Sequence, residues 1–322
     1  MGWRADILVD DAMLHEALAR DVRLGLGGCP KTLPPKYFYD AQGSALFEQI
    51  TRLPEYYLTR AETGLHETYA EDIVTRSAPA EVVELGAGSV TKVRRLLAAA
   101  ARRRAIVRYV PMDIAAATIA AAGAALEDGF PNLDIHGIVG DFEQHLAHVP
   151  APVGRRLVVF FGSTIGNLDP GPRRVFLDAV RNLVGLDDRF LLGLDLVKDR
   201  QVLQAAYDDT AGVTAEFNRN ILRVVNRGLD GNFVPEAFHH RARYDEAAAR
   251  IEMHLVAGTR QIARLGQLGL TVDVACDESI WTESSYKFTH DSARDMLSDS
   301  GLGIERWYSD GAFALVLAAR DR

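Results

Sequence analysis

The stretch Val82-Val83-Glu84-Leu85-Gly86-Ala87-Gly88-Ser89 is an apolar run that ends in an acidic residue and opens into a Gly-x-Gly turn. A helix-favouring segment follows the turn. We predict a buried parallel strand whose carboxyl end faces a small-molecule site, because glycines let the backbone approach a ligand that a Cβ would push away. The turn indicates a nucleotide-like cofactor but does not distinguish one cofactor from another.

Strands and helices alternate between residues 80 and 197. The predicted strands are Glu81–Leu85, Val107–Met112, Leu133–Val139, Arg156–Phe161 and Arg189–Leu196, and the predicted helices are Lys92–Arg104, Ala115–Leu126 and Pro172–Leu183. Strands this apolar are buried on both faces, which predicts an α/β fold with a parallel, doubly wound sheet. The chain ends in a predicted helix and two strands, a hairpin that by analogy is typical of class I (Rossmann-like) methyltransferases: Asp291–Ser300, Gly303–Tyr308 and Ala312–Ala318.

The alternation breaks after residue 197. The predicted elements there are two helices and three strands, namely Arg200–Tyr207, Ala215–Arg227, Arg250–Val256, Arg260–Ala263 and a run that ends at Phe288. We predict that residues 1–60 and 198–286 form a smaller α+β substrate-binding domain. Residues 61–197 and 287–322 form the cofactor-binding domain in this prediction.

The composition excludes several classes of protein. Of the 322 residues, 48% are hydrophobic and 25% are charged, which argues against disorder, and the net charge of -8 argues against nucleic acid as a partner. The longest apolar-looking stretch, Ile114–Leu126, is too short to span a membrane, and the N-terminus lacks the pattern of a signal peptide. We therefore expect a cytoplasmic protein without a membrane partner, and we expect it to be a monomer.

The sequence predicts no metal site. The two cysteines, Cys29 and Cys276, lie far apart in the chain, which fits a reducing compartment and excludes a cysteine-based zinc cluster. Neither His145-x-x-His148 nor His239-His240 has convincing metal-ligand spacing on a clear element.

Acidic residues narrow the choice of cofactor. Asp113 ends the second predicted strand, where a carboxylate can accept hydrogen bonds from both ribose hydroxyls of an adenosine. Asp141-Phe142 follows the third predicted strand. Thr91 stands where a pyrophosphate-binding Gly-x-Gly-x-x-Gly turn has its last glycine, which favours S-adenosylmethionine (SAM) over NAD. Lys92 is either a surface lysine or a counter-ion to the carboxylate of the cofactor.

Two further segments carry polar side chains. Gly162-Ser163-Thr164-Ile165-Gly166-Asn167 follows a central strand, where it is either a capped turn or part of a ligand site, and we favour the ligand site. Glu283 and Ser285 lie on one face of an extended segment. Such a pair is suited to a ring with an N–H group, although a solvated strand face fits the pattern equally well.

With these residues identified, the chain resembles the histidine-specific, SAM-dependent Nα-methyltransferases of ergothioneine biosynthesis over nearly its whole length. The motifs that carry the resemblance are Leu33–Asp40, Ile50–Tyr57, Gly162–Asn167, Asp195–Asp199, Ala206–Asp209, Phe217–Asn220, Ile251–Met253 and Thr282–Phe288. The resemblance implies three methyl transfers from SAM to the α-amine of L-histidine, by way of its mono- and dimethyl forms, to give the betaine hercynine. A related alternative substrate is another aromatic amino acid such as tryptophan. Two other classes, an NAD-dependent oxidoreductase and a binding protein without catalysis, are less favoured.

The resemblance also implies roles for individual residues. The residues implied to bind SAM are Tyr39, Gly86, Lys92, Asp113, Asp141 and Phe142. Those implied to bind the substrate are Tyr56, Asn167, Tyr207, Met253, Glu283, Ser284 and Ser285, with Tyr56, Asn167 and Tyr207 in the catalytic group. The chain departs from the family pattern at Ala87, Ser89, Tyr37, His254, Ser284 and Tyr286, of which the last three concern the predicted substrate pocket.

Overall fold

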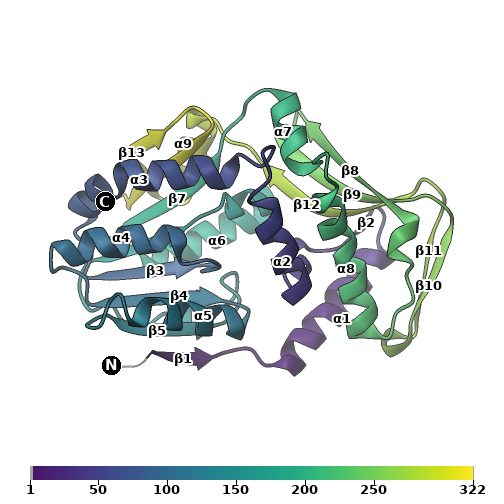
Figure 1. The fold of residues 1–322 in the computed structure, drawn as a ribbon, viewed down its shortest axis with the longest axis horizontal. Coiled ribbons are helices and arrows are strands. Elements are labelled where there is room, and N and C mark those ends of the chain that lie inside the picture. Colours follow the sequence, from purple (N-terminus) through teal and green to yellow (C-terminus); the bar gives the residue numbers. More distant parts are fainter. Residues whose placement is uncertain (1–2, 322) are drawn as a thin grey trace. The chain divides into compact units, whose positions relative to one another are not determined.

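A computed structural model describes residues 3–321 of the chain. The chain divides into two compact units (Figure 1). The first unit comprises Met1–Asp10, Leu58–Leu196 and Phe288–Arg322, and the second comprises Asp11–Tyr57 and Val197–Lys287. Among residues 3–321, no helix combines the length and the apolar content that crossing a bilayer requires.

The first unit is built on an eight-stranded sheet. Its strands, in spatial order, are β1 (Arg4–Ile7), β5 (Asp134–Val139), β4 (Arg108–Asp113), β3 (Glu81–Leu85), β6 (Arg156–Phe160), β7 (Arg189–Asp195), β14 (Phe313–Arg320) and β13 (Leu302–Ser309). The first six run parallel, and β14 and β13 close the sheet as an antiparallel hairpin. Every residue of β3 and β6 is buried, as expected for parallel strands covered on both faces. The predicted class I methyltransferase fold is confirmed.

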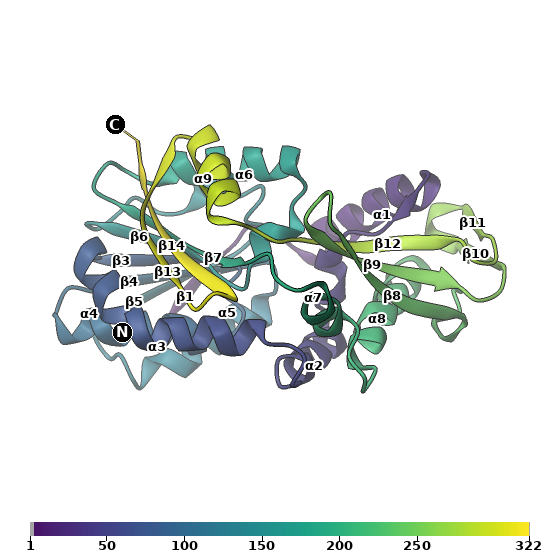
Figure 2. The same ribbon diagram turned by 90° about the horizontal axis from the view of Figure 1, so that it is seen from above.

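Helices cover both faces of this sheet (Figure 2). One face carries α3 (Leu58–Ser77), α4 (Thr91–Arg102) and α5 (Ala116–Glu127). The other carries α6 (Pro170–Leu183) and α9 (His290–Asp299), and the short 3-10 helices η2 (Leu146–His148) and η3 (Thr164–Asn167) complete the unit.

A β-strand and an α-helix of the first unit were not predicted. Strand β1 pairs in parallel with β5, whereas the predicted ranges assigned residues 1–60 to the other domain. It has four residues, mostly exposed at the sheet edge, so it shows no run of apolar residues that sequence reasoning could detect. Helix α3 buries Glu62 and His66 among its apolar side chains, which interrupts the apolar stripe expected of a surface helix.

The second unit contains a four-stranded sheet and a hairpin. The sheet has the order β2 (Lys31–Thr32), β12 (Ser279–Tyr286), β9 (Arg250–Ala257) and β8 (Phe238–Asp245), and the hairpin pairs β10 (Gln261–Leu265) with β11 (Leu270–Val274). The helices are α1 (Asp11–Gly27), η1 (Pro35–Phe38), α2 (Ala41–Ile50), α7 (Arg200–Tyr207), α8 (Val213–Leu229), η4 (Pro235–Ala237) and η5 (Gly266–Leu268). Helices α7 and α8 pack on β8 and β9, and α2 packs on α8.

Candidate active site

Four neighbouring strands of the first unit end at one edge of its sheet. Strands β5, β4, β3 and β6 are adjacent and parallel, so the residues that follow them come together. This edge gathers Asp141 after β5, Asp113 at the end of β4, Gly86 after β3 and Asn167 in the loop after β6. Open α/β sheets bind ligands at this edge. The sequence prediction therefore placed all four residues at the correct end of their strands.

The glycine turn after β3 is held against the end of β4. Gly86 and Gly88 have φ angles of 66° and 45°, a region that side chains with a Cβ rarely adopt. The amide of Ala87 donates to the carbonyl of Met112 at 3.0 Å, and the amide of Gly88 donates to Asp113 Oδ2 at 3.3 Å. The turn thus presents bare backbone beside a carboxylate, without side chains of its own in the way.

The loop after β5 presents a second carboxylate and an aromatic ring. Asp141 Oδ1 accepts a hydrogen bond from the amide of Glu143 at 2.8 Å, which fixes the side chain. The ring of Phe142 packs edge-on against Phe160, with centroids 5.2 Å apart. A Cβ added at Gly86 would lie 3.7 Å from the ring of Phe142, so the ring stands directly beside the turn.

Lys92 has a buried partner that the sequence did not reveal. Its Nζ lies 2.6 Å from Glu62 Oε2, and the Glu62 side chain is only 1% exposed. The other carboxylate oxygen of Glu62 accepts from the amide of Gly162 at 2.9 Å. Glu62 therefore links the lysine after β3 to the loop after β6. Glu62 lies on α3, a helix that was not predicted. Its position in the sequence therefore gave no indication of its contacts with Lys92 and Gly162.

Glu84 precedes the glycine turn and is almost fully buried. Burial raises the pKa of its carboxyl to about 8, although a hydrogen bond from the Tyr109 hydroxyl acts in the opposite direction. The group is therefore mostly protonated at neutral pH. Burial likewise raises the pKa of Asp113, opposed by hydrogen bonds from the amides of Ala115 and Gly88.

These residues fit a SAM molecule. The bare turn at Gly86 admits close backbone approach, Asp113 offers a carboxylate for a diol, and Asp141-Phe142 offers an acceptor next to an aromatic face. Lys92, held by Glu62, adds a cation whose charge is opposite to that of the SAM carboxylate. No phosphate is required, and the turn carries no basic side chain that would favour one.

In the second unit, four aromatic rings form a continuous row, which we call the aromatic row: Tyr39, Phe47, Tyr56 and Tyr207. Successive centroids lie 5.5, 6.0 and 6.3 Å apart, and each pair meets edge to face. The row joins three of the predicted site residues with Phe47. Such geometry is favourable between aromatic rings, and the faces of aromatic rings attract cations.

Helix α8 holds the segment that carries Tyr39. Asn220 Nδ2 donates to Asp40 Oδ1 at 2.7 Å, and the same oxygen caps α2 by accepting from the amide of Gly43. A Cβ at Gly43 would lie 1.6 Å from the Phe38 carbonyl oxygen, so only glycine allows the start of α2 to sit this close to η1.

A β-bulge sets the direction of Glu283. Trp281 pairs with His254 and Glu283 pairs with Met253, so one extra residue, Thr282, stands between consecutive pairs. Because neighbouring residues of a strand face opposite sides, the bulge moves Glu283 from the face of Trp281 to the face of Met253. Thr282 is fixed there, since its hydroxyl lies 2.7 Å from its acceptor, Asn218 Oδ1.

Glu283, Ser285 and Met253 therefore share the sheet face on which α7 packs. Burial raises the pKa of Glu283 to about 7, and the nearby charge of Lys287 opposes this shift. The Glu283 carboxyl is consequently poised to gain or lose a proton near neutral pH.

Ser284, for which substrate binding is predicted, does not lie on the face of Glu283. It pairs with Glu252 on the opposite face of the sheet from Glu283 and Ser285. That face also carries His254 and Tyr286, and its charged centre is Glu252, which accepts hydrogen bonds from Arg243 and Arg250. The departures from the family pattern at His254, Ser284 and Tyr286 therefore lie on the face away from Glu283.

Tyr207, Ser285 and Lys287 form a buried triangle of hydrogen bonds. Tyr207 Oη lies 2.8 Å from Ser285 Oγ, and Lys287 Nζ lies 2.8 Å from each of these oxygens. Sequence reasoning missed Lys287, although its spacing continues the alternation of Glu283 and Ser285 along the same face.

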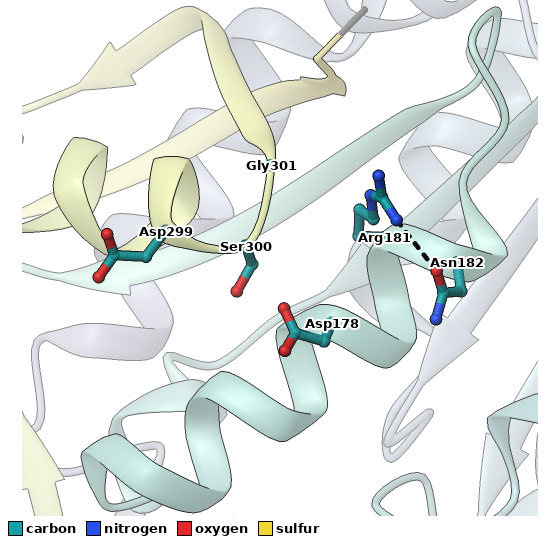
Figure 3. Close-up of a pocket in the computed structure, with 6 residues that line it drawn as sticks. All are labelled: Asp178, Arg181, Asn182, Asp299, Ser300 and Gly301. Atoms are coloured by element: carbon teal, nitrogen blue, oxygen red, sulfur yellow. Dashed lines mark hydrogen bonds between the residues drawn. The ribbon is translucent and has the colours of Figure 1, made fainter.

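No group of three histidine, cysteine, aspartate or glutamate side chains within residues 3–321 is arranged to hold a metal ion. One polar hollow of about 310 Å³ lies between α6 and α9 (Figure 3). It is lined by the C-terminal ends of both helices, including Asp178 and Asp299. These ends lie at the amino edge of the parallel sheet, opposite the loops that follow β3–β6, so the hollow does not belong to the candidate site.

A family model described as "Histidine-specific methyltransferase, SAM-dependent" matches residues 18–320. The chain belongs to this family. Its relatives in the family include the histidine N-alpha-methyltransferase of Mycolicibacterium smegmatis, 48% identical over 307 residues that cover 95% of each chain. The protein of the same name from Mycobacterium tuberculosis is 48% identical over 308 residues, covering 95% of this chain and 96% of its own. The family resemblance and the choice of SAM as cofactor are confirmed.

A more distant relative carries a different substrate in its name. The 4-dimethylallyltryptophan N-methyltransferase of Claviceps purpurea is 28% identical over 313 residues, covering 90% of each chain.

Proposed function

We propose that this member of the histidine-specific methyltransferases transfers three methyl groups from SAM to the α-amine of L-histidine, which gives hercynine for ergothioneine biosynthesis. The observation that carries the proposal is the 48% identity to two histidine N-alpha-methyltransferases over almost the full length of all three chains. The mono- and dimethyl forms of histidine are then substrates as well as products.

The first unit supplies the cofactor-binding residues in this proposal. Gly86, Lys92, Asp113, Asp141 and Phe142 would hold SAM, and Tyr39 of the second unit would cover it. When bound, SAM supplies the methyl group as an electrophile on its sulfonium. Lys92 stays oriented toward the cofactor carboxylate because Glu62 anchors its ammonium from the buried side.

The family resemblance implies the substrate roles, and the chemistry of the side chains suits them. Glu283 accepts the imidazole N–H and Ser285 bonds the second ring nitrogen, because both lie on the same sheet face beside Met253. Tyr207 and Asn167 bind the substrate carboxylate, and Tyr56 lies beside the amino group. The shared sheet face of Glu283, Ser285 and Met253 supports the roles at the imidazole, whereas the roles of Asn167, Tyr207 and Tyr56 rest on the family resemblance.

The protein contributes mainly by positioning. Well-oriented reacting groups lower a barrier by about 7–11 kcal/mol relative to free reactants. The amine acquires positive charge as each methyl is added, and the growing ammonium needs room without a hydrogen-bond acceptor. The aromatic row suits this need, because ring faces stabilise a quaternary ammonium that can no longer donate a hydrogen bond.

A tryptophan-type substrate is the second candidate, because a relative named for such a substrate matches nine-tenths of the chain. The pair on β12 disfavours it. An indole could donate its N–H to Glu283, but it has no second ring nitrogen for Ser285. The pair therefore makes one hydrogen bond fewer to indole than to imidazole, which favours imidazole.

The test is a methylation assay on a panel of amino acids with SAM, read by mass spectrometry. L-Histidine is expected to gain three methyl groups, whereas L-tryptophan, L-tyrosine and L-phenylalanine are expected to gain none at the same enzyme concentration. Methylation of tryptophan in preference to histidine would establish the second candidate instead.

We further propose that the protein acts in the cytoplasm and as a monomer, without a nucleic-acid partner. The two cysteines support the location, since both are free and exposed, as suits a reducing compartment. The net charge of -8 supports the absence of a nucleic-acid partner.

A further inference from the structure

Lys287 is a buried charged side chain that the proposed reaction does not use. It is only 3% exposed, and it lies at the end of β12 on the face of Glu283 and Ser285. Burying an ammonium is costly unless hydrogen bonds satisfy it, so its surroundings need an explanation. Its ammonium contacts the two hydroxyls proposed to touch the substrate, those of Tyr207 and Ser285.

An ammonium has three N–H donors and cannot accept a hydrogen bond. Both short contacts of Lys287 Nζ therefore have one direction: Tyr207 Oη and Ser285 Oγ are the acceptors, each at 2.8 Å. The two hydroxyls are also 2.8 Å from one another, so one of them donates to the other in the free protein. Whichever arrangement holds, the receiving oxygen accepts twice, and its own proton points away from the triangle.

We propose, on the basis of the proposed function, that Lys287 is a positioning residue that makes Tyr207 and Ser285 hydrogen-bond donors toward the substrate and thereby selects a neutral imidazole. When the amino acid binds, both hydroxyl protons turn outward and the hydrogen bond between the two oxygens is given up. The ammonium of Lys287 keeps a hydrogen bond to each oxygen and so offsets the repulsion between their lone pairs. Tyr207 then donates to the carboxylate, and Ser285 donates to the ring nitrogen that carries no proton.

Glu283 completes the selection. Its carboxylate accepts the N–H of the other ring nitrogen, so one acceptor and one donor face the ring from the same sheet face. A neutral imidazole carries its donor and its acceptor on two separate ring nitrogens, so it can bond both side chains at once. Phenylalanine offers neither, and indole offers only the donor.

The test compares Lys287→Met with the wild type through the dissociation constants of L-histidine and L-phenylalanine, measured by competition calorimetry with S-adenosylhomocysteine present. Methionine matches the length of lysine without donors. The ratio of the phenylalanine constant to the histidine constant is expected to fall by about tenfold or more, because Ser285 is no longer held as a donor. If the role of Lys287 were purely structural, the substitution would weaken the binding of both amino acids by the same factor. An unchanged ratio of the two constants therefore overturns the proposal.

Two further proteins make the result decisive. Lys31→Met is the matched control, since Lys31 bonds Glu278 at 2.6 Å at the far end of the same sheet, and both constants are expected to stay within about twofold. If Lys287→Met fails to bind S-adenosylhomocysteine, Lys287→Gln replaces it. That variant keeps one donor group, and its ratio is expected to fall by about threefold or more. An unchanged ratio in Lys287→Gln contradicts the role of Lys287.

The experiments distinguish a failure of the proposed function from a failure of the role proposed for Lys287. A wild-type protein that does not methylate histidine contradicts the proposed function. A wild-type protein that methylates histidine, together with a variant of unaltered selectivity, removes only the role of Lys287.

Discussion

Replacing Glu283 with glutamine tests whether its charge binds the imidazole N–H. The structure holds the pKa of this carboxyl at about 7, raised by burial. The side chain is therefore a carboxylate above pH 7 and a neutral acid below it. A charged acceptor strengthens a hydrogen bond by roughly 1.4 kcal/mol over a neutral one, which is about tenfold in binding. Glutamine keeps a neutral acceptor at every pH.

The expected result is a pH-dependent ratio of the histidine KM of Glu283→Gln to that of the wild type. With a pKa of about 7, the ionised fraction of Glu283 is about nine-tenths at pH 8 and about one-tenth at pH 6. The ratio should therefore be about 9 at pH 8 and fall to about 2 at pH 6. Titration of the substrate affects both enzymes alike and cancels in the ratio.

Steady-state methyl transfer with saturating SAM, measured at half-unit steps from pH 6 to pH 8, provides the numbers. Glu278→Gln is the control, because the hydrogen bond from Lys31 lowers the pKa of Glu278 and keeps it ionised throughout this range. Its ratio should not change with pH. A ratio for Glu283→Gln that is equally constant would refute the reasoning, since it would mean that the charge of Glu283 does not contribute to binding.

Three other substitutions have definite expected outcomes. Asn167→Ala should raise the histidine KM by about tenfold or more while leaving S-adenosylhomocysteine affinity within about twofold, and an unaltered KM would count against its role at the carboxylate. Glu84→Gln should be more stable relative to the wild type at pH 8 than at pH 5. The folded-state pKa of Glu84, about 8, lies above its unfolded value, so wild-type stability falls by on the order of 4 kcal/mol as pH rises through this interval. Urea unfolding at pH 5 and pH 8 measures the difference in the free energy of unfolding between the variant and the wild type. The same difference at both pH values would contradict a protonated, buried Glu84. His66→Phe should raise the melting temperature, increasingly so from pH 7 to pH 5, because burial lowers the pKa of His66 to about 3 and neither ring nitrogen has a partner among the described residues. A variant that melts below the wild type at pH 5 would show that the ring of His66 packs against Phe161 in a way that phenylalanine cannot match.

Much of the first unit could be predicted because its signals are local. The strand Glu81–Leu85 was predicted with the bounds that the structure gives it, and the strands around it were placed within one or two residues. Buried parallel strands are continuous apolar runs, so their ends are visible in the residue order. The same regularity placed Gly86, Asp113 and Asp141 at one sheet edge.

Features that depend on distant partners could not be predicted. Strand β1 is recognisable only by its hydrogen bonds to β5, more than a hundred residues away. The carboxylate of Glu62 accepts hydrogen bonds from Lys92 and from the amide of Gly162. No spacing along the chain indicates these contacts.

Strand β12 has one feature that could be predicted from local sequence and one that depends on a distant partner. Alternation along a strand is a local rule, so the residue order was enough to place Glu283 and Ser285 on one face. The same rule, applied without the bulge at Thr282, would also have put Trp281 there. Pairing with β9 shifts the register at that point and sends Trp281 to the other side. A bulge arises from the fit between two strands, and the buried triangle around Lys287 arises from the packing of α7 on the sheet. The residue order thus specifies the glycine turn and the pair Glu283 and Ser285, whereas contacts between distant segments set the face of the sheet on which the pair lies.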